Sequence, residues 1–141
     1  MSLARKIRQL VVMTPNEVGM LQEVCATAGN TGATILHICA SALGSDARFM
    51  LTVDRVDEVR AALEVREFEV SEITVIEIEL DNVGGSLQPV ATLLGHANID
   101  IEFLYGTSTS GNTTLCVLST NDNDQAVEIL NGAPLEAALT A

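Results

Sequence analysis

Aromatic residues are scarce in this sequence: they make up 3% of its 141 residues, and tryptophan is absent. Hydrophobic residues nevertheless make up 48%, so a core formed by this chain is aliphatic. No apolar run reaches the roughly 18 residues that a membrane-spanning helix requires. The first residues, "MSLARKIRQLVV", lack the long apolar segment and the cleavage site of a secretion signal. The composition therefore predicts a globular protein with no membrane partner.

Cysteine is equally sparse, with three residues at widely separated positions: Cys25, Cys39 and Cys116. An odd number and irregular spacing argue against a disulfide framework and against a paired-cysteine metal clip. We expect each thiol to behave as a small buried apolar residue. Because no secretion signal precedes them, the predicted compartment is the reducing cytoplasm.

Positive charge is missing from the second half of the chain, because no lysine or arginine follows Arg66. The seven basic residues up to that point are balanced by seven acidic ones, and twelve acidic residues follow, which gives a net charge of −12. Contacts with phosphate groups require cations. The distribution therefore argues against nucleic acid or an anionic membrane as a partner of the second half.

The sequence does contain an internal repeat. "NEVGMLQEV" at residues 16–24 and "NVGGSLQPV" at residues 82–90 share asparagine, glycine, leucine, glutamine and valine at an offset of 66 residues. This offset continues without a gap to Ala40 and Gly106, and an offset of 67 then aligns Leu63 with Leu130. A repeat of this length indicates two copies of one structural unit.

Each copy shows the same order of predicted elements: strand, turn, helix, strand, strand, helix. In the first helix, Leu21, Val24 and Ala28 stand at i, i+3 and i+7, which is typical of a helix with one apolar face. Along residues 76–80, isoleucine and leucine alternate with glutamate, which predicts a strand with one buried and one solvated face.

We therefore predict an α+β fold of two ferredoxin-like βαββαβ units in tandem, each with an antiparallel sheet and its helices on one face. The predicted units span residues 5–71 and 72–141, with the boundary near Ser71. The segment "EFEVS" can supply a fourth strand to the first unit, whereas its counterpart "NGAPLEAALTA" is a poor strand. Units this small, with an open sheet edge, are marginal alone, which predicts tight pairing and a homodimer.

The ACT domain has a strand, a loop of Asp/Asn-x-Pro-Gly-x-Leu type, a helix, and a second strand that opens with Gly-Ile-Asn-Ile, and this chain resembles a tandem pair of such domains. The stretches "NEVGMLQEVCATAGNTGATI" and "NVGGSLQPVATLLGHANIDI" carry this pattern, and the resemblance covers nearly the whole chain. Val18 and Gly84 stand where the family has a proline. The matching residues are Asn16, Gly19, Leu21 and Ile35 in the first copy, and Asn82, Gly85, Leu87, Ile99 and Ile101 in the second.

The resemblance implies a non-enzymatic regulatory module that binds a small effector, usually an amino acid, at interfaces between paired domains. In the family, the turn before the first helix contacts the ligand together with the second strand of a neighbouring domain. The implied partner is a separate enzyme or regulator of amino-acid metabolism, and no cofactor is implied. The implied ligand-binding residues are Asn16, Val18, Gly19, Met20, Leu21 and Ile35, and Asn82, Gly84, Gly85, Ser86, Leu87 and Ile101.

The chemistry of the two turns suits an amino acid. A helix start presents backbone N–H groups without partners, which can hold a carboxylate. Glycine lets a ligand approach the backbone closely, and Asn82 or Ser86 can cap the helix or accept a bond from an ammonium group. Because basic residues are few, a zwitterion with an apolar side chain fits better than a phosphate or a dicarboxylate.

Two other interpretations remain open at this point. The turns can serve only as turns and helix caps, in which case the protein is a structural module with a degenerate pocket that mediates oligomerisation. The other is an enzyme on the same fold, such as an acylphosphatase-like hydrolase. That chemistry needs an arginine beside a glycine loop, and neither loop has one nearby.

The remaining reactive residues favour structural roles. We expect His37 to be packed on a strand, His96 to lie on the surface, and Tyr105 to belong to the core or an interface. "NDNDQA" at residues 121–126 lacks the glycine and the late glutamate of a calcium loop, so it predicts a helix N-terminus with favourable acidic residues. We therefore predict neither a catalytic residue nor a metal site.

Overall fold

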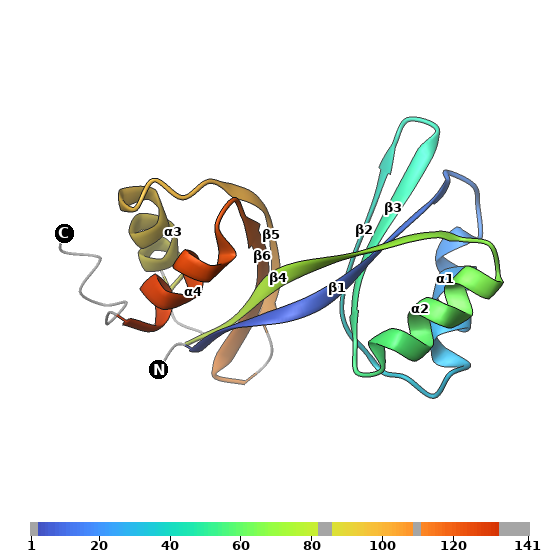
Figure 1. Cartoon of the computed structure of the whole chain (residues 1–141), viewed down its shortest axis with the longest axis horizontal. Helices are drawn as coiled ribbons and strands as arrows, with labels where there is room; N and C mark the ends of the chain where they lie inside the picture. The colour runs from blue at the N-terminus through green and yellow to red at the C-terminus, as the bar shows by residue number, and fades with distance from the viewer. Residues whose placement is uncertain (1–2, 82–85, 109–110, 133–141) are drawn as a thin grey trace. The chain divides into compact units, whose positions relative to one another are not determined.

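A computed structural model describes residues 3–81, 86–108 and 111–132. It confirms the α+β class: the described residues form four helices and six strands, and the strands follow the order β2-β3-β1-β4-β6-β5 (Figure 1). The strands are β1 (Leu3–Pro15), β2 (Ile35–Leu43), β3 (Asp46–Val53), β4 (Glu69–Asp81), β5 (Ile101–Ser108) and β6 (Thr113–Thr120). The helices are α1 (Met20–Gly29), α2 (Val56–Val65), α3 (Leu87–His96) and α4 (Asn123–Gly132).

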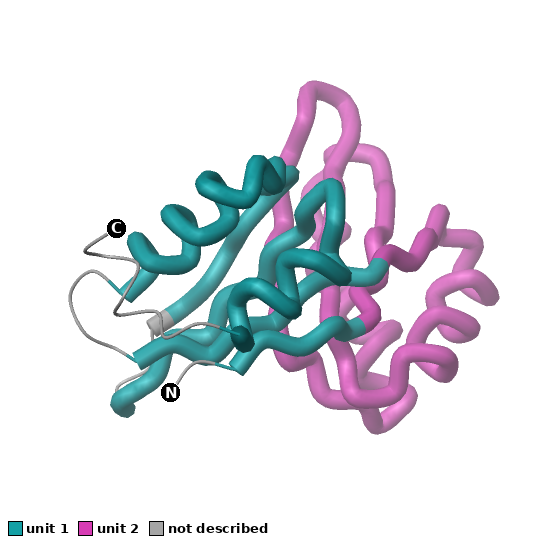
Figure 2. The backbone as a smooth tube through the Cα atoms, turned by 60° about the vertical axis from the view of Figure 1, so that its left-hand side comes forward, with its two compact units in different colours: residues 1–7, 74–141 teal, residues 8–73 magenta. Residues whose placement is uncertain are grey.

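The chain divides into two compact units. Figure 2 colours them as unit 1, Met1–Ile7 with Thr74–Ala141, and unit 2, Arg8–Ile73. The division falls inside the two long strands, β1 and β4, so each of these strands contributes residues to both units. The sequence placed residues 5–71 in one unit and 72–141 in the other, whereas the structure groups residues 1–7 with 74–141.

Unit 2 has its strands in the order β2-β3-β1-β4, with α1 and α2 on one face of the sheet (Figure 1). Strand β3 pairs antiparallel with both β1 and β2. Alternate residues point to the same face of a strand, and those facing the helices are apolar. This aliphatic core with one aromatic ring contains Leu10, Val12, Val24, Ala28, Phe49, Leu51, Val59 and Leu63.

The predicted apolar face of α1 is confirmed for Val24 and Ala28, which are fully buried. Leu21, however, remains 49% exposed. It lies in the first turn of a helix that begins at Met20, where the helix reaches the end of the sheet. The leucine therefore contributes little to the core and faces a hollow described below.

Unit 1 contains the strands β1-β4-β6-β5 and the helices α3 and α4. Its fourth strand position, for which the sequence offered only the poor strand at residues 131–141, is occupied by the first residues of the chain, at the start of β1. Residues 133–141 of that tail lie outside the described residues. The core of unit 1 contains Ala4, Ile76, Ile78, Leu80, Val90, Leu94, Leu118 and Leu130.

The alternation predicted for β4 holds on its buried face, where Ile76, Ile78 and Leu80 are at most 2% exposed. The opposite face is less solvated than predicted. The Glu77 side chain is only 13% exposed, because Arg5 of β1 lies beside it and forms an ion pair of 2.8 Å. None of the helices in the described ranges has the length and apolar character needed to cross a membrane.

Candidate functional site

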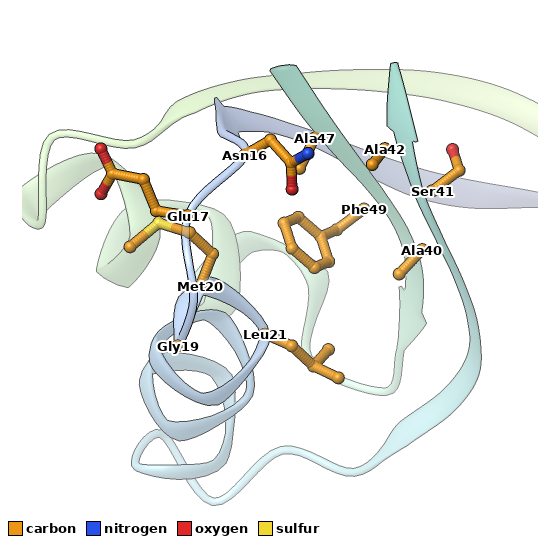
Figure 3. Close-up of a pocket in the computed structure, with 10 residues that line it drawn as sticks. All are labelled: Asn16, Glu17, Gly19, Met20, Leu21, Ala40, Ser41, Ala42, Ala47 and Phe49. Carbon is orange, nitrogen blue, oxygen red and sulfur yellow. The ribbon is translucent and has the colours of Figure 1, made fainter. Parts of the chain in front are cut away.

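A hollow of about 260 Å³ lies in unit 2, between the turn that joins β1 to α1 and the adjoining ends of β2 and β3 (Figure 3). The turn is the one that the repeat and the ACT resemblance singled out. The lining residues are Asn16, Glu17, Gly19, Met20, Leu21, Ala40, Ser41, Ala42, Ala47 and Phe49. The structure thus brings four of the predicted site residues, Asn16, Gly19, Met20 and Leu21, together around one cavity.

The turn is held in place by the hairpin between β2 and β3. The backbone N–H of Asn16 donates to the carbonyl of Ser45 at 2.8 Å, and its side-chain amide donates to the carbonyl of Gly44 at 3.2 Å. Gly19 then adopts a left-handed conformation, with φ 94° and ψ −4°. Side chains disfavour this region, so glycine is required at this position for its backbone conformation.

Helix α1 begins at the hollow without a side-chain cap. The first intrahelical bond runs from the N–H of Glu23 to the carbonyl of Gly19, at 3.1 Å. The N–H groups of Leu21 and Gln22 have no acceptor among the residues that the structure describes. The hollow therefore adjoins two free backbone donors and the positive end of the helix dipole.

Asn16 supplies an acceptor to the same cavity. Because its amide nitrogen is engaged by Gly44, its carbonyl oxygen is the atom that faces the ring of Phe49 in Figure 3. No donor among the described residues bonds to this oxygen. The Glu17 side chain also lines the hollow, but Figure 3 shows its carboxylate directed away from the Phe49 ring.

The sheet side of the hollow is apolar. Ala40 lies opposite Phe49 across β2 and β3, and Ala42 lies opposite Ala47, so all four side chains share the face covered by the helices. Phe49 is 4% exposed and belongs to the core of unit 2. The hydroxyl of Ser41 points away from the ring in Figure 3. Within the described part of the chain, the lining includes no lysine, arginine or histidine.

Two predicted residues of the first copy do not line the hollow. Val18 is fully exposed at the tip of the turn. Ile35 lies at the opposite end of β2 and packs against the core of unit 2. The register explains this position: the end of β2 beside the turn is Ala40–Leu43, which pairs with the start of β3. The sheet residues of the hollow could not be identified from sequence, because they depend on that register.

The second copy is described only in part. Asn82, Gly84 and Gly85 lie outside the described residues. Ser86 is the N-cap residue of α3, with φ −67° and ψ −23°, but its hydroxyl forms no capping bond, contrary to one of the two roles expected for it. Leu87 is 41% exposed, compared with 49% for Leu21 in the first copy. Ile101 packs against the core of unit 1.

The segment at residues 121–126 is the start of α4, as predicted. Asp122 accepts a bond from the N–H of Gln125 at 3.1 Å, and Asp124 pairs with Lys6. The side-chain amide of Asn123 donates to the carbonyl of Thr74 at 2.9 Å. A polar hollow of about 470 Å³ lies here, yet its polar groups already serve these bonds. No group of three potential metal ligands occurs in the described ranges.

The cysteines are all free thiols. Cys116 is buried in the core of unit 1, and burial raises the pKa of its thiol. Cys25 and Cys39 are half-buried. The burial expected for the cysteines is therefore confirmed for Cys116, whereas Cys25 and Cys39 are only partly buried.

The fold is shared with known structures. No protein-family model and no curated protein matches the sequence. The protein BT0572 from Bacteroides thetaiotaomicron is similar, at 24% identity and a TM-score of 0.86 over 92% of this chain and 89% of that one. The ligand-free regulatory subunit of aspartate kinase from Thermus thermophilus matches at 17% identity and a TM-score of 0.64, over 89% and 91%.

The corresponding subunit from Thermus flavus gives 15% identity and the same TM-score over 96% of both chains. Likenesses at this level of identity establish the fold. The chain therefore has the fold of aspartate kinase regulatory subunits, and the resemblance to ACT domains predicted from its sequence is confirmed at the level of the fold.

Proposed function

We propose that the protein is a non-enzymatic regulatory module, built from two ACT domains in tandem, that binds a free amino acid in the hollow of unit 2. The observation that carries this proposal is the composition of that hollow. The free N–H donor of Leu21, an acceptor oxygen from Asn16, and an apolar wall around Phe49 meet at one cavity, and the free N–H of Gln22 is the next along the chain. These are the three chemical features that an apolar α-amino acid requires.

Each part of the ligand has a matching group. The carboxylate meets the N–H groups of Leu21 and Gln22 at the positive end of α1. The ammonium group donates to the Asn16 carbonyl oxygen. The apolar side chain lies against Phe49 and the surrounding alanines. Because no basic side chain lines the described hollow, a phosphate or a second carboxylate would lack a counter-charge.

The size of the hollow also supports a single amino acid. Its volume of about 260 Å³ falls just below the range of about 300–1,000 Å³ found for drug-sized ligands. The similar Thermus proteins are regulatory subunits of aspartate kinase, which supports a regulatory role. The regulated partner is then a separate enzyme or regulator of amino-acid metabolism.

We further propose that the protein is a homodimer in the reducing cytoplasm. Strand β2 stands at the edge of the sheet in unit 2, where its backbone groups can pair with another strand. Three large apolar side chains of this strand are exposed, namely Leu36, Ile38 and Leu43. The same edge is the observation that favours the second candidate function, a module that only mediates assembly.

The free thiols suit a reducing compartment.

The test is a thermal-shift screen of the full chain against the twenty amino acids. At a ligand concentration of about 100 times Kd, binding stabilises the folded state by about 2.7 kcal/mol. The variant Gly19→Val places a branched side chain beside the hollow. In the protein without ligand, a Cβ at position 19 has no other atom within 4 Å, so the new side chain would clash only with a bound ligand. We expect this variant to lose the shift.

The matched control is Gly32→Val, because Gly32 has a similar left-handed conformation, with φ 86°, and lies at the far end of α1. Valine at position 32 should strain the backbone about as much as valine at position 19. Because Gly32 does not line the hollow, the ligand-induced shift in melting temperature should survive. If no amino acid raises the melting temperature of the wild type, the regulatory function is refuted and the assembly function takes its place.

A further inference from the structure

The sheet wall of the hollow is made from three alanines and one phenylalanine. Ala40, Ala42 and Ala47 each present a single methyl group, so the space of the cavity exists because these positions are small. Phe49 is the large residue of the wall, and its ring stands between Asn16 and Leu21 in Figure 3. On the sheet side, the volume open to a ligand is therefore limited mainly by this ring.

The ring of Phe49 is a fixed boundary. The residue is 4% exposed and belongs to the core of unit 2 together with Val12, which lies opposite it on β1. Core side chains pack at a density that leaves no room for a large displacement. A ligand that needs the space of the ring cannot obtain it by moving the ring aside.

The matching pair in unit 1 is different. There, Gly106 of β5 lies opposite Cys116 of β6, as Ala40 lies opposite Phe49 in unit 2. A Cβ built on Gly106 would lie 2.7 Å from the Sγ of Cys116. The two copies of the repeat thus fill the same cross-strand position in different ways, with glycine and a thiol in one and alanine and an aromatic ring in the other.

We infer that Phe49 and Ala40 set an upper limit on the side chain of the ligand, so that the hollow of unit 2 selects α-amino acids with short aliphatic side chains. This inference rests on the proposed function, since it concerns the ligand of the same site. A short aliphatic group lies flat against the ring and within the three alanines. Leucine and phenylalanine extend into the volume that the ring occupies.

The experiment measures binding of alanine, valine, leucine and phenylalanine to the full chain by calorimetry. For the wild type, we expect alanine or valine to bind at least tenfold more tightly than leucine and phenylalanine. One extra methylene in a ligand can alter its preference for an apolar pocket by about 10-fold or more. The variant Phe49→Leu opens the cavity and should reduce this preference at least tenfold. Ala40→Val should weaken the binding of valine more than that of alanine.

The control variant is Leu51→Val, which alters a fully buried residue of the same strand that does not line the hollow. It should keep the wild-type order of affinities. The inference is overturned if the wild type binds phenylalanine as tightly as valine, or if Phe49→Leu keeps the wild-type order. A wild type that binds none of the twenty amino acids refutes the proposed function and this inference with it, whereas binding without size selection refutes the inference alone.

Discussion

The side chain of Asn131 holds the backbone of Ala4 by two hydrogen bonds, although the residues are 127 positions apart. Its carbonyl oxygen accepts from the N–H of Ala4 at 2.8 Å, and its amide nitrogen donates to the carbonyl of Ala4 at 2.8 Å. One residue at the end of α4 thus satisfies both backbone groups of one residue in β1. The start of the chain is thereby fastened into unit 1.

The substitution Asn131→Ala should lower the free energy of unfolding by about 1–3 kcal/mol, because it leaves the partly buried N–H and carbonyl of Ala4 without partners. Urea denaturation followed by circular dichroism measures the change. Gln125→Ala on the same helix is the control, since Gln125 is exposed, and it should be neutral. Equal midpoints for the two variants would show that the two bonds contribute nothing.

The two glycines at the ends of α1, Gly19 before its first residue and Gly29 at its last, should respond to alanine substitution in opposite directions. Gly19→Ala should destabilise the protein by about 1–2 kcal/mol, because Gly19 holds φ 94°. Gly29→Ala should stabilise it by about 0.5–1 kcal/mol, because Gly29 is within the helix and an added Cβ meets no atom within 4 Å. Calorimetric melting of both variants checks the pair, and an unchanged melting temperature for Gly19→Ala would contradict the backbone argument.

In unit 1, Gly106→Ala should cost about 1–3 kcal/mol through overpacking, because the new Cβ would lie 2.7 Å from the Sγ of Cys116 and 2.9 Å from the carbonyl oxygen of Leu115. In the double variant Gly106→Ala/Cys116→Ala, the clash between the new Cβ and the Sγ is absent. The loss of unfolding free energy in the double variant should therefore be smaller than the sum of the losses in the two single variants. Chemical denaturation of all three variants completes the cycle. Strict additivity would mean that the close approach carries no energy.

An ion-pair cluster in unit 2 should make stability depend on pH. Arg8 donates to both carboxylate oxygens of Glu72, at 2.8 and 3.0 Å, and to Asp57 at 2.7 Å. Hydrogen bonding to Arg8 holds the pKa of each carboxyl group below its usual value in the folded protein. The stabilisation is therefore complete above the ordinary pKa values near 4 and is lost as pH falls through the lowered ones.

The variant Arg8→Gln should lose this contribution, so its stability at pH 7 should be lower and should decline less steeply below pH 5. Because these groups are exposed or half-buried, the effect is modest. Arg66→Gln removes the same charge from a residue with no ion pair in the described part of the chain, and it should keep the wild-type slope. Identical slopes for wild type and Arg8→Gln would refute the assignment.

The exposed edge at β2 predicts the oligomeric state. Light scattering should give twice the chain mass of 14.9 kDa for the wild type. Ile38→Lys places a charge on the edge strand and should shift the protein to the monomer. Val65→Lys changes a more exposed apolar residue at the end of α2 and should leave the dimer intact. A monomeric wild type would exclude the homodimer.

The sequence allowed prediction of those features that depend on neighbours along the chain. The alternation at Ile76, Ile78 and Leu80 and the helical spacing of Val24 and Ala28 each predicted a buried face, and the structure shows these residues buried. The turn at Asn16–Leu21 was found from the repeat, because glycine and asparagine report local backbone geometry.

Other features depend on contacts between distant segments. The pairing of Ala40 with Phe49 follows from the register of the β2–β3 hairpin. A shift of one strand by one residue would turn its side chains to the opposite face of the sheet. The place of residues 3–7 in unit 1 rests on contacts with residues far along the chain, including the two hydrogen bonds between Ala4 and Asn131. Neither the strand at the start of the chain nor the alanines of the hollow carries a local signal for these partners.

The two hydrogen bonds between Ala4 and Asn131 also set an order of events during synthesis. Unit 2 lies wholly within residues 8–73, so its folding can be complete soon after those residues leave the ribosome. Ala4 of β1 precedes Asn131 of α4 by 127 positions, so the two hydrogen bonds that join β1 to α4 form late in synthesis. At typical elongation rates this delay is roughly 6 to 25 seconds. During that interval the backbone groups of Ala4 lack the partners that Asn131 later supplies.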